Sequence, residues 1–208
     1  MKEKIFELFP TPFFISKIEV DSQQLKSKIN AISDNSELIS HDGYEHPYSD
    51  QLFQRSEFLE LRNTIQKYVD YFLREVMLCR YDESYFSCSW YNINKPNSTH
   101  HRHYHPNSII SGVLFVCVPP NSGQLVFISP NINRDVVPDK KINVPQNKFS
   151  SATFCPVQEA GTLVLFPSFV EHQVSKNESD ENRYTISFNV FVKGHLGNSR
   201  ELTYCRLG

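Results

Sequence analysis

Hydrophobic positions follow a helical period in the first part of this chain. From Ser56 onward, apolar residues recur at spacings of three and four, at Phe58, Leu61, Ile65, Val69, Phe72 and Val76. Because such spacing lines one stripe of a helix, it predicts a long helix that packs by that stripe. A shorter and weakly amphipathic helix is predicted over 22–32, with Asp21 as its N-cap.

Beyond residue 84 the period changes to that of strands. Runs of β-branched and aromatic residues, separated by Pro, Gly and Asn turns, occupy 84–94, 109–118, 124–128, 161–166 and 183–192. Such short strands predict a single β sandwich or jelly roll that carries helices on one side.

Three further segments show neither pattern clearly. Residues 5–18 are extended but interrupted by Pro10 and Pro12, so we expect them to start the sheet at an edge or bulge. Residues 35–55 are polar and turn-rich, which predicts a loop. The irregular stretch 129–160 is long enough to predict a functional loop or lid.

Composition narrows the class of protein. A chain of 208 residues with 39% hydrophobic content predicts one domain with a substantial core. The formal charge of −2 and the scattered Lys and Arg residues make nucleic-acid binding an unfavoured function. The start of the chain lacks the apolar core of a signal peptide, and no apolar run approaches the roughly 20 residues of a membrane span. Five cysteines without a CxxC pair favour a reducing compartment, so we expect a cytoplasmic protein.

Four histidines crowd into residues 100–105. Residues two apart on a strand share a face, so His103 and His105 can direct their imidazoles into one space. Imidazole suits Zn, Fe, Cu and Ni, and His172, just after a predicted strand, is the candidate third ligand. His100 and His101 are expected in the preceding loop. The alternative is a polar loop in which histidines cluster by chance.

Arg183 enters an apolar strand, where an unpaired charge is costly unless it meets an anion. Its planar fork suits a carboxylate, and the hydroxyl of Thr185 shares the same face. A salt bridge to an acid of the protein is the alternative. Polar residues of the neighbouring strands are candidates to line the same pocket or to serve ordinary packing, namely Tyr91, Asn92, Asn94 and Asn189. Trp90 is expected in the core.

The order of these motifs resembles a known family. The stretches WYNIN (90–94), HYHPNSIISGV (103–113), GQLVF (123–127), GTLVLFPSFVEHQV (161–174) and RYTISFN (183–189) together resemble the iron(II) and 2-oxoglutarate dependent oxygenases common in bacteria and phages. These form a distant branch of the prolyl-4-hydroxylase-like superfamily. LFPTPFF (8–14) and LTYCRL (202–207) look like that family too, so the resemblance covers nearly the whole chain.

The resemblance implies a mainly β fold with flanking helices, a double-stranded β-helix or jelly roll. It implies one domain over 1–208, in which an N-terminal strand and helices, about 1–80, pack on a β-helix core, about 84–194. It also implies Fe2+, 2-oxoglutarate and O2 as cofactor and cosubstrates.

The family's site residues carry over to this chain with one departure. His103 matches the first metal ligand and His172 the distal one, while Arg183 and Thr185 match the pair that holds the far carboxylate of 2-oxoglutarate. His105 stands where the family usually carries an acid. The third ligand is therefore either His105 or a carboxylate, from Glu171 or from the 129–160 stretch.

The implied reaction is hydroxylation of an unknown substrate, a protein side chain or a small molecule, with release of succinate and CO2. If the chain is phage-encoded, it would act in the host cytoplasm, and its oligomeric state stays open. The rival interpretations are a β-barrel metal-binding or assembly module without oxygenase activity, and a cupin-like zinc enzyme.

Overall fold

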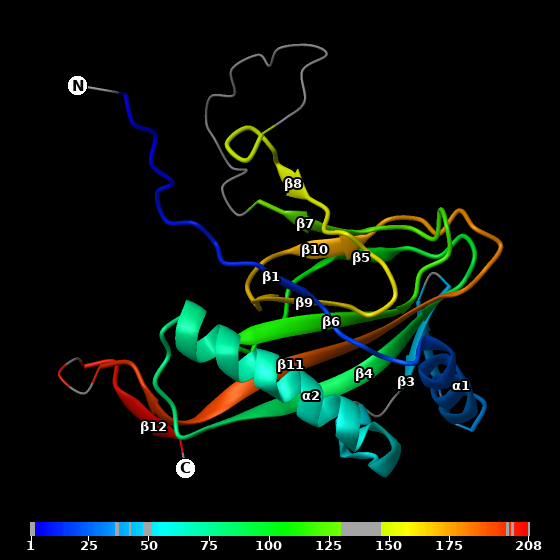
Figure 1. Ribbon diagram of the computed structural model, residues 1–208, viewed down its shortest axis with the longest axis horizontal. Coiled ribbons are helices and arrows are strands. Elements are labelled where there is room, and N and C mark those ends of the chain that lie inside the picture. Colours follow the sequence, from blue (N-terminus) through cyan, green and yellow to red (C-terminus); the bar gives the residue numbers. More distant parts are fainter. Residues whose placement is uncertain are drawn as a thin grey trace.

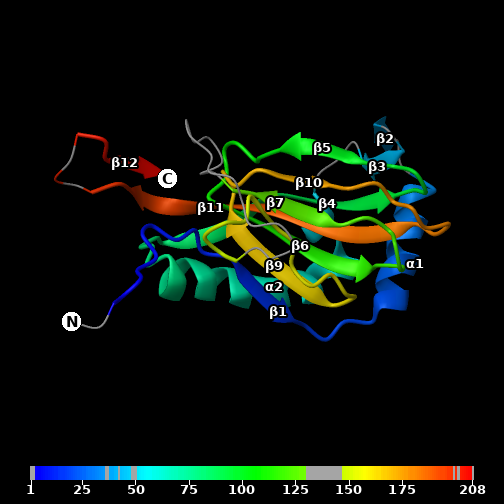
Figure 2. The ribbon, with the colours of Figure 1, turned by 90° about the horizontal axis from the view of Figure 1, so that it is seen from above.

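Two antiparallel β-sheets face one another, and helices cover the outer face of the larger sheet (Figures 1 and 2). This computed structural model describes residues 3–35, 38–41, 43–47, 51–129, 147–198, 200 and 202–207. The larger sheet has the strand order β1-β9-β6-β11-β4-β3-β2, with β12 paired to β11. The smaller sheet has the order β5-β10-β7-β8. The predicted jelly roll with flanking helices is confirmed.

The strands of the larger sheet are β1 (Phe14–Lys17), β2 (Leu38–His41), β3 (Tyr44–Pro47), β4 (Glu83–Asn94), β6 (Ile110–Cys117), β9 (Thr162–Pro167), β11 (Arg183–Leu196) and β12 (Cys205–Leu207). Those of the smaller sheet are β5 (His100–His103), β7 (Leu125–Ile128), β8 (Thr153–Phe154) and β10 (His172–Val174). The helical elements are α1 (Ser22–Ser33), the 3-10 turns Leu52–Gln54 and Ser56–Phe58, α2 (Leu59–Tyr71) and a π-helical turn, Phe72–Val76.

Both predicted helices are present. Asp21 caps α1, since its side chain accepts a hydrogen bond from the backbone N–H of Gln24 at 2.9 Å. The long helix runs through the predicted 56–76, but only its middle is α-helical. Most of its apolar stripe is buried, including Phe58, Ile65 and Val69, whereas Val76 at its end is exposed.

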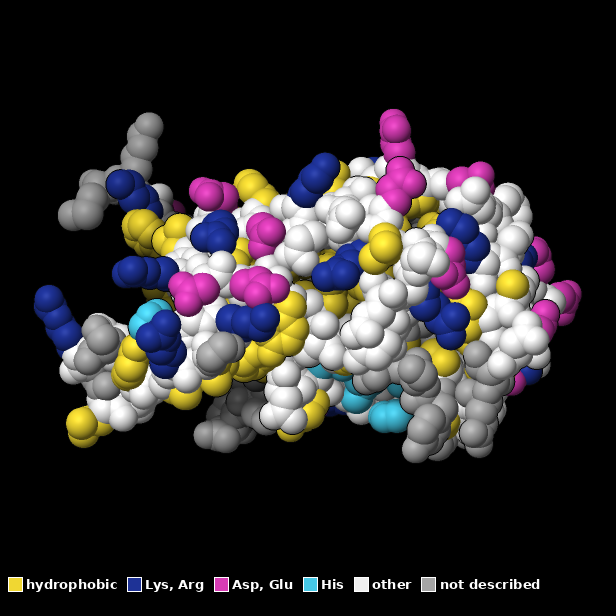
Figure 3. Space-filling view, turned by 90° about the horizontal axis from the view of Figure 1, so that it is seen from below, with side chains coloured by type: hydrophobic (Ala, Val, Ile, Leu, Met, Phe, Trp, Pro, Cys, Tyr) yellow, Lys and Arg dark blue, Asp and Glu magenta, His cyan; other side chains and the backbone are white. Residues whose placement is uncertain are grey.

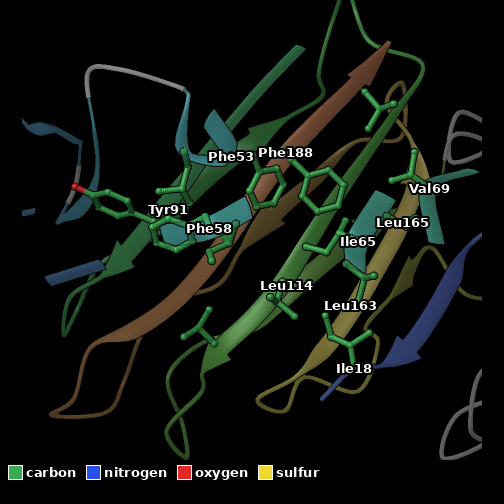
Figure 4. Close-up of a cluster of buried hydrophobic side chains, with 14 of the residues drawn as sticks. Ile18, Phe53, Phe58, Ile65, Val69, Tyr91, Leu114, Leu163, Leu165 and Phe188 are labelled. Carbon is green, nitrogen blue, oxygen red and sulfur yellow. The ribbon is translucent and has the colours of Figure 1, made fainter. Parts of the chain in front are cut away.

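Alternation along the strands of the larger sheet separates two cores. On the helix side, Phe53, Phe58 and Ile65 pack with the sheet residues Leu114 and Phe188 (Figure 4). On the other side, between the sheets, a second core is formed by Val113, Phe115, Leu125, Phe127, Val164, Phe166, Val170 and Val174. In the larger sheet, β4 and β11 carry candidate site residues, and each therefore has one face toward the helices and one toward the space between the sheets.

The prediction of a loop over 35–55 is partly wrong. The segment contains β2 and β3, because Tyr44 and Glu45 pair with Asn94 and Ile93 at the edge of the sheet. Tertiary pairing thus gives strand structure to a polar, turn-rich sequence that has little strand propensity.

The predictions for residues 5–18 and 129–160 have different outcomes. The N-terminal prediction is confirmed, since β1 pairs with β9 at the far edge of the larger sheet, after both prolines. Of the predicted loop over 129–160, residues 130–146 lie outside the described residues, and 153–154 form β8 on the edge of the smaller sheet.

The surface carries no strong charge pattern on the face shown in Figure 3. Basic and acidic side chains are interspersed there, and a group of histidine side chains reaches the surface at one margin (Figure 3). Within the described part of the chain, no helix is long and apolar enough to cross a membrane.

Candidate metal centre

Three histidines from the smaller sheet and its adjoining loop converge on one point. The ring centroids of His103 and His172 are 4.3 Å apart, and those of His105 lie 5.2 Å from His103 and 5.1 Å from His172. One ring nitrogen from each falls within 4.8 Å of the other two. Three imidazole nitrogens at this separation can bind one metal ion.

The local backbone explains the convergence. His103 on β5 is the register partner of His172 on β10, so their side chains share a face. His105 lies beyond the end of β5, and its backbone N–H donates to the carbonyl of Ser168 at 3.0 Å. That bond holds the departing chain against the loop before β10, so the imidazole still points back to the cluster.

Hydrogen bonds orient two of the rings. Nδ1 of His103 lies 2.8 Å from the carbonyl oxygen of His101, and Nδ1 of His172 lies 3.0 Å from that of Val170. Because a carbonyl only accepts, each Nδ1 carries the proton and each Nε2 keeps its lone pair. This is how metal-binding histidines are usually held.

Burial keeps the histidines neutral. It lowers the pKa of His105 to about 3, with repulsion from the other two imidazoles adding to the effect. It also lowers the pKa of His172 to about 4 and lowers that of His103. Neutral imidazole is the form that binds a metal, so the cluster is ready to do so at neutral pH.

The carboxylate alternative for the third ligand finds no support among the described residues. Glu171 forms a salt bridge with Arg102 and belongs to neither group of metal-ligand side chains in the described part of the chain. Acids at 130–146 lie outside the described residues.

His100 and His101 lie in β5, not in a preceding loop as predicted. The His100 ring stacks on Tyr44, with centroids 4.1 Å apart, and lies 4.2 Å from the ring of His103. Burial and the neighbouring imidazoles lower the pKa of His100 to about 2. His100 is therefore part of the site, although the sequence suggested only a polar neighbour.

The pocket that holds this cluster also contains a buried arginine. Arg183, the first residue of β11, is 1% exposed, and its guanidinium lies over the ring of Phe115 at 5.2 Å. It donates to Gln158 Oε1 at 3.0 Å and to Asn94 Oδ1 at 3.4 Å, while its Nε has no hydrogen-bond partner among the described residues. No acid of the described chain forms a salt bridge with it, so the alternative of an internal ion pair finds no support there.

Arg183 stays cationic in this setting. Burial lowers the pKa of its guanidinium to about 10, which leaves the group charged at neutral pH. A charge buried against neutral partners is unfavourable, and an anionic ligand would relieve that cost. The pocket therefore combines a candidate metal site with a candidate anion site.

A hydrogen-bonded network supports the polar wall of the pocket. The Asn92 amide donates to the hydroxyls of Thr185 at 3.0 Å and Ser187 at 2.8 Å, and its oxygen accepts from Tyr44. Asn92 on β4 faces Thr185 on β11 as its register partner, so the two strands present these groups to the same space. The lining residues of the pocket are Tyr44, Trp90, Asn92, Asn94, His100, His103, His105, Val113, Leu125, His172, Val174, Arg183, Thr185 and Ser187.

Two residues predicted to line the pocket lie elsewhere. Tyr91 is fully buried in the core between the larger sheet and the helices, because it alternates with Trp90 and Asn92 along β4. Asn189 shares the face of Arg183 but lies farther along β11, where its oxygen accepts from Ser111 and its amide donates to the thiol of Cys88.

The sequence also missed several lining residues, among them Trp90, Ser187 and Tyr44. Trp90, expected in the core, lines the pocket, with its ring 5.7 Å from that of His105. Ser187 follows Thr185 by two positions, and strand alternation could have identified it. Tyr44 carried no signal, because its strand forms only by pairing with β4.

Fold and site together point to a class of protein, a jelly roll whose pocket combines a candidate metal site with a buried cation. Residues 88–189 match the family described as "Putative 2OG-Fe(II) oxygenase". That segment contains the three clustered histidines and Arg183. Over that segment the chain is similar to the 2OG-Fe(II) oxygenase family.

Solved structures of low sequence identity share the fold. The non-heme alpha ketoglutarate dependent epimerase SnoN from nogalamycin biosynthesis has a TM-score of 0.65 at 11% identity, over 92% of this chain and 83% of that one. A Pseudomonas putida prolyl-4-hydroxylase has a TM-score of 0.59 at 13% identity, over 88% and 94%. HygX from Streptomyces hygroscopicus, with nickel and 2-oxoglutarate bound, has 0.56 at 11%, over 86% and 82%. No curated protein matches the sequence.

Proposed function

We propose that this chain is an Fe(II)- and 2-oxoglutarate-dependent dioxygenase that hydroxylates its substrate and releases succinate and CO2. One observation carries the proposal: a single pocket between the sheets is lined both by the histidine cluster and by a buried arginine without an acid partner in the described chain. A metal-binding module without oxygenase activity would not need the second feature.

The residues present fit a ferrous ion. His103, His105 and His172 would hold it through neutral imidazole nitrogens, two of which are oriented by backbone carbonyls. Three neutral ligands leave the ion its full charge, which a dianionic cosubstrate can offset. The bound metal would supply the activation of O2 and the anchoring of a keto acid.

Arg183 and Thr185 would bind the far carboxylate of 2-oxoglutarate. The guanidinium fork and the hydroxyl lie on one face of β11, and the Asn92 amide holds the Thr185 oxygen in place. With one end fixed by the protein, the cosubstrate has a single orientation relative to the histidines. Val113, Leu125 and Val174 form apolar parts of the wall, which would favour the exclusion of water once the cosubstrate is bound.

The finer assignments follow from the same interpretation. We propose one domain over residues 1–208, supported by the core that joins the N-terminal helices to the larger sheet. The substrate would be a protein side chain or a small molecule, and the protein would act in the cytoplasm. HygX has been solved with hygromycin B bound, so this fold accepts a small molecule in at least that relative.

An optical titration tests the function. Anaerobic protein is given ferrous iron and then 2-oxoglutarate, and a weak visible charge-transfer band is expected from a keto acid bound bidentately to iron. His172→Ala serves as the control, which should show no band. If the parent protein shows no band while zinc binds tightly, the zinc-enzyme or binding-module interpretation replaces the oxygenase.

A further inference from the structure

The side chain of Gln158 binds the backbone of Leu125 as a strand residue would. Its Oε1 accepts from the Leu125 N–H at 2.8 Å, and its Nε2 donates to the Leu125 carbonyl at 3.1 Å. Amide orientations are often ambiguous, but here a backbone donor and a backbone acceptor on the same residue determine which end is oxygen. The Gln158 oxygen is therefore fixed at the first residue of β7.

That fixed oxygen also accepts a hydrogen bond from Arg183 at 3.0 Å. It is the shorter of the two hydrogen bonds that the guanidinium makes with described side chains, since the contact with Asn94 is 3.4 Å. Both acceptors are neutral. They orient the guanidinium but leave its charge uncompensated. A carboxylate at either position would neutralise that charge.

Gln158 also separates two spaces. Its side chain lines a groove with Pro156, Val157 and Gln124, whereas Arg183 lines the separate pocket of the histidines. The amide thus lies between solvent in the groove and the buried cation.

We propose that Gln158 is a positioning residue for the anion site, which aims Arg183 into the pocket and, by being neutral, leaves the charge of Arg183 available to the cosubstrate. This inference rests on the proposed function, because it assigns Gln158 a part in binding 2-oxoglutarate. Gln158 lies outside the sequence motifs that carry the candidate metal ligands and Arg183.

The test is the substitution Gln158→Glu. Glutamate keeps the length of the side chain and an acceptor for the Leu125 N–H and for Arg183. It loses the donor to the Leu125 carbonyl and adds a charge that competes with the ligand's carboxylate. The KM for 2-oxoglutarate should rise about tenfold or more, an effect of about 1.4 kcal/mol, while kcat at saturation changes little. The dissociation constant of 2-oxoglutarate, measured by calorimetry on the nickel-loaded protein, should rise equally without turnover.

Gln124→Glu is the matched control. It makes the same chemical change in the same groove, one residue before Leu125, but its side chain is exposed. It should bind 2-oxoglutarate as the parent does. Pyruvate, which lacks the far carboxylate, should bind equally well to the Gln158→Glu variant and to the parent, a result that a general loss of structure would not give.

The outcomes separate this inference from the proposed function. If Arg183→Leu weakens 2-oxoglutarate binding and Gln158→Glu does not, the role of Gln158 is refuted and the anion site stands. If neither change has an effect, the anion site itself is refuted. Should Gln158→Glu fail to fold, Gln158→Met replaces it, and an unchanged affinity in that variant would also overturn the inference.

Discussion

The metal-free protein should lose stability steeply between about pH 7.5 and pH 5.5. An unfolded histidine has a pKa of about 6.5, whereas burial in the folded chain lowers the pKa of His100, His105 and His172 to about 2, 3 and 4. Because the folded values lie below the unfolded one, the unfolded state binds more protons as the pH falls through 6.5. Their contribution to stability is therefore complete above that pH and is lost on acidification toward the folded values.

The size of the effect follows from the unfolded state alone. At about pH 5.5 each unfolded histidine gains about 1.4 kcal/mol from protonation that its folded counterpart cannot gain, so the three lower the free energy of unfolding by about 4 kcal/mol. Charged groups that face the cluster do not oppose this. Arg183 and the remaining imidazoles disfavour a proton, and no carboxylate of the described chain lines the pocket.

Urea unfolding in the presence of a chelator, at both pH values, measures this loss. His105→Asn removes one of the three groups, so the loss between the two pH values should shrink by about 1.4 kcal/mol. Carboxylates elsewhere add the same pH dependence to parent and variant, and the difference between them isolates the histidine. A variant with the parent's full pH dependence would refute the neutral, buried state of His105.

Two further predictions concern the third ligand and the packing of the larger sheet. In calorimetric titrations with zinc, His105→Ala should lose as much affinity as His103→Ala, whereas Glu171→Ala should bind normally because its carboxylate pairs with Arg102; the reverse result would restore a two-histidine, one-carboxylate site. Gly112→Ala should lower the free energy of unfolding by about 1–3 kcal/mol, since a Cβ there would lie 2.2 Å from the Phe188 ring; a parent-like thermal midpoint would contradict the packing described.

The candidate anion site is built on two residues that the sequence pattern already placed on one face of a strand. Arg183 and Thr185 share a face because they are two apart on a strand, a relation that any register preserves. The same holds for the apolar stripe of α2, whose period alone predicts a buried face. Local periodicity therefore predicted the helices, most strands and the arginine's neighbour.

The local sequence did not determine which face of a strand lines the pocket. The run from Trp90 to Asn94 carries an aromatic residue on each face, Trp90 with the two asparagines on one and Tyr91 with Ile93 on the other, so either face could have lined the pocket. The helices settled the matter by burying Tyr91 on their side, which turned Trp90 and Asn92 toward the histidines.

Only the tertiary structure determined the contacts between segments that are distant in sequence. Tyr44 reaches the pocket because β3 pairs with the end of β4, and polar residues gain strand structure only from such a partner. His105 leaves its strand yet stays in the cluster, because its backbone N–H binds the carbonyl of Ser168. A period of two determines which residues share a face, but the hydrogen bonds and packing between distant segments determine what that face meets.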